Sequence, residues 1–212
     1  MRVQVSKSES SFEEKFEDGI YPGAIIGVRY GMGTNDKGLP RESNCFLLAV
    51  SDDENKVVLK KSKEFSCATF NPKGNFAKMV SAMLKIPCTE DDISSALTEM
   101  GWMDENGLEM ANFLGMPVNV TIKIDISKTD SSKTFANVAD LSKSTARVGK
   151  IELPKDGGRV PKWFQTPYKG SFKDSELLEG WTWVEGDDSE AAAQPSEAQP
   201  STIQIDEDSI PF

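Results

Sequence analysis

The stretch Pro117–Ile126, PVNVTIKIDI, alternates between apolar and polar side chains along its whole length. Successive side chains of a β-strand point to opposite faces of the sheet, so a period of two predicts a strand that is buried on one face and wet on the other. The apolar side predicted to face the core consists of Val118, Val120, Ile122, Ile124 and Ile126.

Four more segments are rich in β-branched, aromatic and aliphatic residues and are bounded by turn-forming residues. They are Gly19–Tyr30, residues 44–51 (NCFLLAVS), Lys56–Phe70 and residues 134–141 (TFANVADL). The sequence DDEN at 52–55 separates the second and third segments and predicts a hairpin. Residues 31–43 are predicted to form a flexible loop, and residues 127–133 a turn.

Between the third and fourth predicted strands, in residues 71–116, the apolar period changes from two to that of a helix. Asn75 is predicted to cap a first helix, and Pro87 to end it. Its apolar stripe is Phe76, Met79, Val80, Met83 and Leu84. Thr89 and Asp92 resemble a capping box at the start of a second helix, and residues 106–115 predict a third, short helix.

This order predicts a mainly β protein with inserted helices, specifically an elaborated five-stranded OB-fold barrel with a helical insert at 71–116 between strands 3 and 4. An unrelated sandwich is the alternative. The predicted divisions are an N-terminal lead-in (1–18), the OB-fold domain (19–150), an irregular aromatic-containing extension (151–185) with one helical turn at Asp174–Leu178, and a disordered acidic tail (186–212).

The net charge of −10 is concentrated in the last segment. Residues 186–212 contain seven acids and no base, which leaves 27 acids against 24 bases in the rest of the chain. The body is therefore close to neutral and need not repel a polyanion. The sequence has no long apolar stretch that predicts a membrane span or a signal peptide. Three cysteines without a CxxC pair fit a reducing compartment, so we expect a cytoplasmic location.

No pattern in the sequence predicts an enzyme. The chain has no histidine, which removes the commonest general base and metal ligand. Its separated cysteines do not form a zinc motif, and neither YGMGTND nor ARVGK has the glycines that a dinucleotide or phosphate loop requires. The acids of DDEN and EDD are better explained by a turn and a helix start than by magnesium binding. We therefore expect no catalytic residue, no metal and no cofactor.

The chain ends with DEDSIPF, and this end resembles the tip of bacterial single-stranded-DNA-binding proteins, in which acids precede a terminal Ile-Pro-Phe. Ser209 stands where those tails usually have another acid. The stretches GIYPGAIIGV, NFLGMPVNVTI and KTFANVADL resemble phage-encoded OB-fold proteins that bind single-stranded DNA (ssDNA). The resemblance implies a protein that coats ssDNA in replication, recombination or repair, inside a host cytoplasm if a phage encodes it.

Binding of ssDNA without sequence preference requires cations along the phosphates and flat rings on which bases stack. Each candidate also has a structural explanation, as a solvated lysine or as a core aromatic residue. The predicted ssDNA-binding residues are Arg29, Tyr30, Arg41, Lys60, Lys61, Lys63, Phe65, Lys123 and Phe135. Further rings lie in the extension, where we expect packing against the barrel: Trp163, Phe164, Tyr168, Trp181 and Trp183.

The acidic tail has a mechanistic role in this interpretation. A polyanion can occupy a cationic groove until DNA displaces it, and the freed tip can then bind a polymerase, helicase, primase or nuclease. The predicted partner-binding residues are Asp206, Glu207, Asp208, Ile210, Pro211 and Phe212. The chain is also a possible homo-oligomer. The alternatives are a protein-interaction adaptor that does not bind DNA, an acidic DNA mimic that inhibits a host enzyme and, third, a nuclease.

Overall fold

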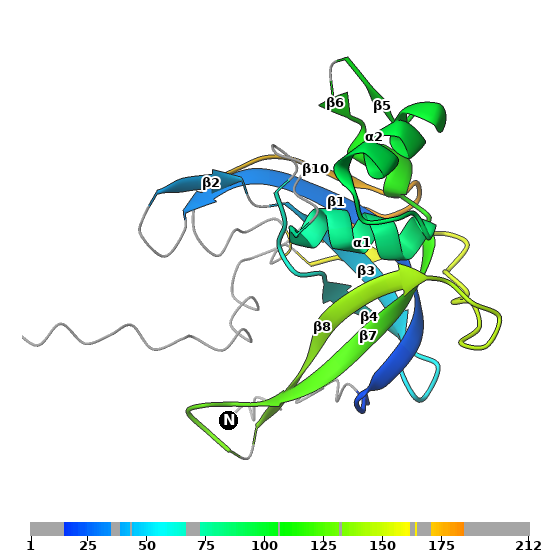
Figure 1. The fold of residues 1–212 in the computed structure, drawn as a ribbon. Helices are drawn as coiled ribbons and strands as arrows, with labels where there is room; N and C mark the ends of the chain where they lie inside the picture. The colour runs from blue at the N-terminus through cyan, green and yellow to red at the C-terminus, as the bar shows by residue number, and fades with distance from the viewer. Residues whose placement is uncertain are drawn as a thin grey trace, which may run out of the picture.

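In the computed structural model, the protein is mainly β and is built around one large antiparallel sheet (Figure 1). The structure describes residues 15–34, 39–42, 44–66, 73–105, 107–131, 133–161, 164 and 171–184. The central strands follow the order β4-β3-β1-β7-β8. Their bounds are Val57–Lys61 (β4), Cys45–Ser51 (β3), Gly19–Thr34 (β1), Pro117–Ile126 (β7) and Thr134–Lys143 (β8).

Strands β7, β1, β3 and β4 form a Greek key. Of the five central strands, the first three along the chain are β1, β3 and β4, and the fourth, β7, returns after a long connection to lie beside β1. That connection carries two helices, α1 (Asn75–Leu84) and α2 (Glu90–Glu99). The sheet curves enough for its two end strands, β4 and β8, to contact each other.

The strand β1 is longer than predicted, and two further short strands pair with it. The strand continues to Thr34, where β2 (Pro40–Glu42) pairs with it, although the sequence predicted a flexible loop here. The extension contributes β10 (Ser171–Leu177), which pairs antiparallel to β1 from Gly27 to Met32. The helical turn predicted at Asp174–Leu178 is therefore wrong, because an unpaired edge of β1 is available to this segment.

The third predicted strand is shorter than its sequence pattern suggested. The strand β4 ends at Lys61, and Ser62 then anchors the chain by a two-way interaction with Phe46. The Ser62 backbone N–H donates to the Phe46 carbonyl over 2.9 Å, and the Phe46 N–H donates to Ser62 Oγ over 2.9 Å. After this point only Phe65 returns to the sheet, as a bridge to Asn44. Residues 67–70 lie outside the described part of the chain.

The helix starts follow local hydrogen bonding. Thr89 caps α2 as predicted, since the Asp92 backbone N–H donates to its side-chain oxygen over 3.2 Å. The cap of α1 is Gly74 and not the predicted Asn75, whose side chain instead donates to the Glu64 carbonyl over 3.4 Å. The third predicted helix is only a short 3-10 turn.

The remaining elements are small. They are β5 (Met103–Asp104), β6 (Gly107–Leu108), the 3-10 turn η1 (Met110–Phe113), β9 (Arg159–Val160) and β11 (Thr182–Trp183). The strand β5 pairs with β6, and β9 pairs with β11. No helix in the described ranges has the length and apolar character needed to cross a membrane.

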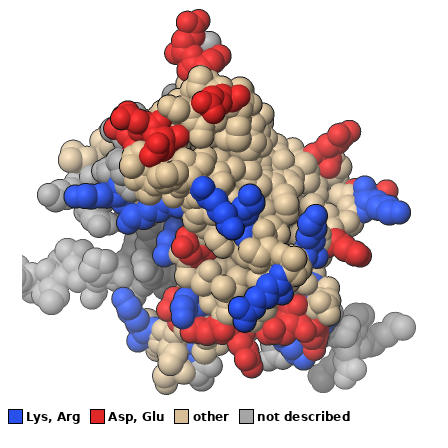
Figure 2. All heavy atoms as spheres, turned by 45° about the vertical axis from the view of Figure 1, so that its right-hand side comes forward, with Lys and Arg blue, Asp and Glu red and all other residues tan. Residues whose placement is uncertain are grey.

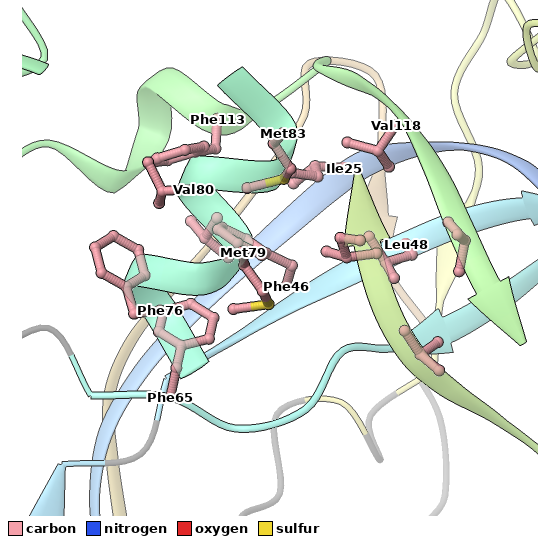
Figure 3. Packing of buried hydrophobic residues seen from close by; sticks show 14 of the residues in the cluster. Ile25, Phe46, Leu48, Phe65, Phe76, Met79, Val80, Met83, Phe113 and Val118 are labelled. Carbon is pink, nitrogen blue, oxygen red and sulfur yellow. The ribbon is translucent and has the colours of Figure 1, made fainter. Parts of the chain in front are cut away.

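The inner core lies between the concave side of the sheet and α1 (Figure 3). Phe46 of β3 is fully buried, and its ring centroid lies 5.0 Å from that of Phe65 and 5.3 Å from that of Phe113. The apolar stripe predicted on α1 packs onto these rings. We call this cluster the inner core. Its labelled members in Figure 3 are Ile25, Phe46, Leu48, Phe65, Phe76, Met79, Val80, Met83, Phe113 and Val118.

Candidate nucleic-acid interface

The β7–β8 hairpin projects beyond the rest of the sheet (Figure 1). Pairing of β7 with β1 stops at Ile122, opposite Gly19, whereas pairing of β7 with β8 continues to Ile126, opposite Thr134. Beyond Ile122, β7 and β8 therefore pair only with each other, although Ile124 and Ala136 still pack against the inner-core residues. The predicted core-facing residues Val118, Val120 and Ile122 of β7 are buried, but Asn119 on the predicted wet face is buried as well, and Ile126 is 65% exposed because β1 no longer pairs with the strand there.

Lys123 and Phe135 lie on the same outer face of this projecting hairpin. Lys123 is opposite Asn137, and Phe135 is opposite Asp125, two residues along each strand. Lys123 is exposed and Phe135 is half-buried. The hairpin thus presents one cation and one ring on the same face.

The cation of this pair is held by a neighbouring carboxylate. Lys123 Nζ lies 3.2 Å from Asp18 Oδ2, and the Ile124 backbone N–H donates to Asp18 Oδ1 over 2.7 Å. The hydrogen bond from Ile124, followed by the one from Lys123, lowers the pKa of Asp18 below its usual value. Asp18 therefore keeps Lys123 in place at neutral pH. Because both side chains of this ion pair are more than half exposed, a stronger anion can replace the carboxylate at little cost.

Three predicted lysines lie at or just after the end of β4: Lys60, Lys61 and Lys63. Lys60 and Lys61 are adjacent and therefore point to opposite faces, opposite Leu48 and Leu47 respectively. Lys60 Nζ lies 5.2 Å from the centroid of the Phe16 ring. Lys61 Nζ lies 3.8 Å from Glu64 Oε1. Lys63 follows the end of the strand and is exposed.

Two of the predicted ssDNA-binding residues lie inside the protein, which corrects their place in the candidate surface. Arg29 is fully buried: its Nη1 donates to the Phe164 carbonyl over 2.9 Å, and its Nη2 lies 3.3 Å from Glu64 Oε1. Burial lowers the pKa of Arg29. Phe65 is 1% exposed and packs in the inner core, with its ring centroid 5.1 Å from that of Phe76. Neither side chain is accessible to DNA in this structure.

The structure describes only some of the other predicted residues. Tyr30 is half-buried against the inner core, near the point where β1 leaves the main sheet. Arg41 lies in β2 opposite Gly33, and its side chain is outside the described part of the structure. The six tail residues from Asp206 to Phe212 also lie outside it.

The extension covers the outer face of β1 and β3. Val160, Phe164 and Trp181 pack there against alternate residues of the two strands, so that β3 is buried on both sides. We call this cluster the outer layer. Its buried members are Ile26, Cys45, Leu47, Ala49, Val160, Phe164 and Trp181.

This packing has two consequences. Desolvation raises the pKa of the Cys45 thiol to about 11, so Cys45 is an inert packing residue. Phe164 and Trp181 fulfil the expectation that rings of the extension pack on the sheet, and Trp183 stacks on Phe164 with centroids 6.0 Å apart. Trp163 and Tyr168 lie outside the described residues.

Acidic side chains gather at one end of the molecule, whereas acidic and basic side chains are mixed over the rest of the face in Figure 2. Residues 86–116, which include α2 and the β5–β6 hairpin, contain seven acids and no base. This end is at the top of Figures 1 and 2, and Lys and Arg side chains lie across the middle of the face below it. Among the residues that the structure describes, no group of three His, Cys, Asp or Glu is placed to hold a metal ion.

Sequence reasoning missed the cations at the tip of the projecting hairpin. Lys128 and Lys133 in the β7–β8 turn are exposed, and Lys133 Nζ lies 3.6 Å from Asp130. Their position next to Ile126 depends on how far β7 pairs with β1, which periodicity does not predict.

No known protein family and no curated protein matches the chain.

Proposed function

We propose that the protein is an OB-fold ssDNA-binding protein that coats exposed strands without strong sequence preference during replication, recombination or repair. The observation that carries this proposal is the placement of the β7–β8 hairpin, with Lys123 and Phe135 on one face, on the same curved sheet as the lysines of β4. Cations beside a ring on a curved sheet are what a sequence-tolerant ssDNA site requires.

The connectivity of the sheet supports the OB-fold part of the proposal. OB-folds are five-stranded, partly open Greek-key barrels whose first and last loops frame the ligand. Here β1, β3, β4, β7 and β8 correspond to strands 1 to 5, and the helical segment joins strands 3 and 4. The β1–β2 arm corresponds to the loop between strands 1 and 2, and residues 127–133 to the loop between strands 4 and 5. In this proposal the barrel domain comprises residues 19–150.

The outer layer limits the path that DNA can take. In OB-folds the exposed face of strands 2 and 3 commonly binds the ligand, but the extension covers this face of β3. The single-stranded DNA would therefore run past the end of β4, at Lys61 and Lys63. It would continue onto the outer face of the β7–β8 hairpin, at Lys123 and Phe135. Phosphates would replace the carboxylates of Glu64 and Asp18 as the partners of these lysines.

The terminal sequence supplies the second half of the function. A carboxyl-terminal Phe212 after Ile210 and Pro211 presents an apolar ring and a carboxylate, which suit a basic-rimmed pocket on a partner protein. The extension (151–185) would thus separate a DNA-binding barrel from an acidic recruitment tail (186–212). This division of labour fits a cytoplasmic protein that brings replication or recombination enzymes to coated DNA.

Titration of fluorescently labelled oligo(dT) with the full chain, followed by anisotropy, tests the proposal. We expect saturable binding, much weaker binding to a duplex of the same length, and no cleavage of either. A binder that stacks bases cannot reach them within a duplex, so the two ligands must differ. Equal affinity for both, or no binding at low salt, would contradict the proposal and favour the adaptor or the DNA mimic.

A further inference from the structure

An apolar groove of about 780 Å³ lies where the end of α1 meets α2 and the start of β7. It is on the side of the molecule where β8 ends, away from the projecting tip of the β7–β8 hairpin (Figure 1). Most of its lining is aliphatic or thioether, and Met100 is 42% exposed at its edge. The apolar residues that line it are Met83, Leu84, Ile86, Ala96, Met100, Met116 and Pro117.

The rim of the groove carries more positive than negative charge. Lys143 and Lys150 line it and are exposed, and Glu99 is the only acid in the lining. Within the described ranges neither lysine forms an ion pair. Lys85, between the lining residues Leu84 and Ile86, is exposed as well. The groove therefore combines an apolar floor with a cationic edge on an otherwise acidic part of the protein.

We propose that this groove binds the tip of the protein's own tail, with Phe212 and Ile210 on the apolar floor and the terminal acids against Lys143 and Lys150. The tip has the complementary chemistry, since three acids and an α-carboxylate flank two large apolar side chains. Docking there hides the tip from partner proteins. The site is separate from the proposed ssDNA surface, and the inference does not depend on DNA binding.

The tail is long enough to reach the groove from any point of the body. Twenty-eight residues follow Val184, the last described residue. A random coil of this length has an end-to-end distance of about 30 Å, and a fully extended chain of this length spans about 95 Å. A body of this size has a radius of gyration of about 16 Å.

Intramolecular attachment makes a weak site sufficient. A short flexible linker gives an effective concentration on the order of 1 mM, so a tip with an intrinsic dissociation constant of this order is docked in about half of the molecules. The electrostatic part of the contact is exposed and is therefore weakened by salt. A partner with a deeper pocket can then withdraw the tip.

Methyl NMR of the full chain labelled with ¹³C-methyl methionine tests this docking directly. Met83, Met100 and Met116 line the groove, while Met32 on β1 and Met79 on α1 do not. We expect Phe212→Ala to shift the three groove methyls, because the ring current of Phe212 is lost, and to leave Met32 and Met79 unchanged. Groove methyls that do not respond to Phe212→Ala, or that change only together with Met32 and Met79, would overturn the proposal.

Two controls identify the contact. Lys143→Glu combined with Lys150→Glu should reproduce the Phe212→Ala shifts, whereas the same reversals at the exposed Lys78 and Lys155 should not. Adding unlabelled full chain to labelled chain that ends at Gln204 should leave the groove methyls of the shortened chain unperturbed at micromolar concentration. Equal perturbation by the second copy would show docking between molecules and overturn the intramolecular assignment.

Discussion

Replacing Phe46 with alanine is expected to lower the free energy of unfolding by about 3–5 kcal/mol. Phe46 is fully buried on β3, and its ring contacts those of Phe65 and Phe113. Truncation removes the apolar surface of the ring and leaves a cavity that the surrounding strands and α1 can fill only in part. This would be a large fraction of the total stability of a domain of this size.

Denaturant unfolding followed by circular dichroism measures this effect, with the change read from the midpoint at constant slope. Ile20→Ala is the control, because Ile20 lies on the neighbouring strand β1 but is 56% exposed. Its expected effect is within about 0.5 kcal/mol. A loss below about 1 kcal/mol for Phe46→Ala would show that β3 and α1 do not meet as described.

Replacing Phe135 with alanine is expected to weaken binding of oligo(dT) by roughly 5- to 150-fold, which corresponds to the loss of about 1–3 kcal/mol for one stacked base. The ring is half-buried on the outer face of the β7–β8 hairpin, beside Lys123. This region pairs only within the hairpin, so the ring is available to a base from the solvent side. Anisotropy titration at fixed salt gives the ratio of affinities.

Two variants separate stacking from loss of structure. Phe135→Trp retains a flat ring and should bind oligo(dT) within about threefold of the unchanged chain, by the same stacking argument. Trp183→Ala removes a ring of the outer layer, which stacks on Phe164, and should leave DNA affinity unaltered. If Phe135→Ala and Trp183→Ala have the same effect, Phe135 has no special role in binding.

Local periodicity predicted most of the sheet correctly. The apolar residues Val118, Val120 and Ile122 of β7 and the apolar stripe of α1 each reflect one buried face, and both are found in the structure, although Asn119 is buried and Ile126 is exposed. The predicted pairing of residues 44–51 with the strand after DDEN is also confirmed, because the Asp52 side chain accepts hydrogen bonds from the Glu54 and Lys56 backbones and closes the turn.

The errors came from contacts between segments distant in sequence. Arg29 has the charge of a phosphate ligand, and only the approach of Glu64 and the Phe164 carbonyl makes it an interior residue. Phe65 follows a lysine-rich strand and looks like a surface ring, but its bridge to Asn44 turns it into the inner core. The strand β10 forms because β1 offers it an edge, which no pattern within residues 171–177 reveals.

The salt dependence of oligo(dT) affinity is the most direct test of the central claim that cations of β4 and the hairpin hold the phosphates. The measurement compares the full chain with a Lys61→Ala/Lys63→Ala variant between about 50 and 200 mM salt. The account predicts a steep linear fall of log affinity with log salt, and a slope smaller by about 1.4 in the variant, since each lost phosphate contact removes about 0.7. Lys85→Ala/Lys155→Ala should retain the full slope. An affinity independent of salt, or equal slopes for both double variants, would contradict the account.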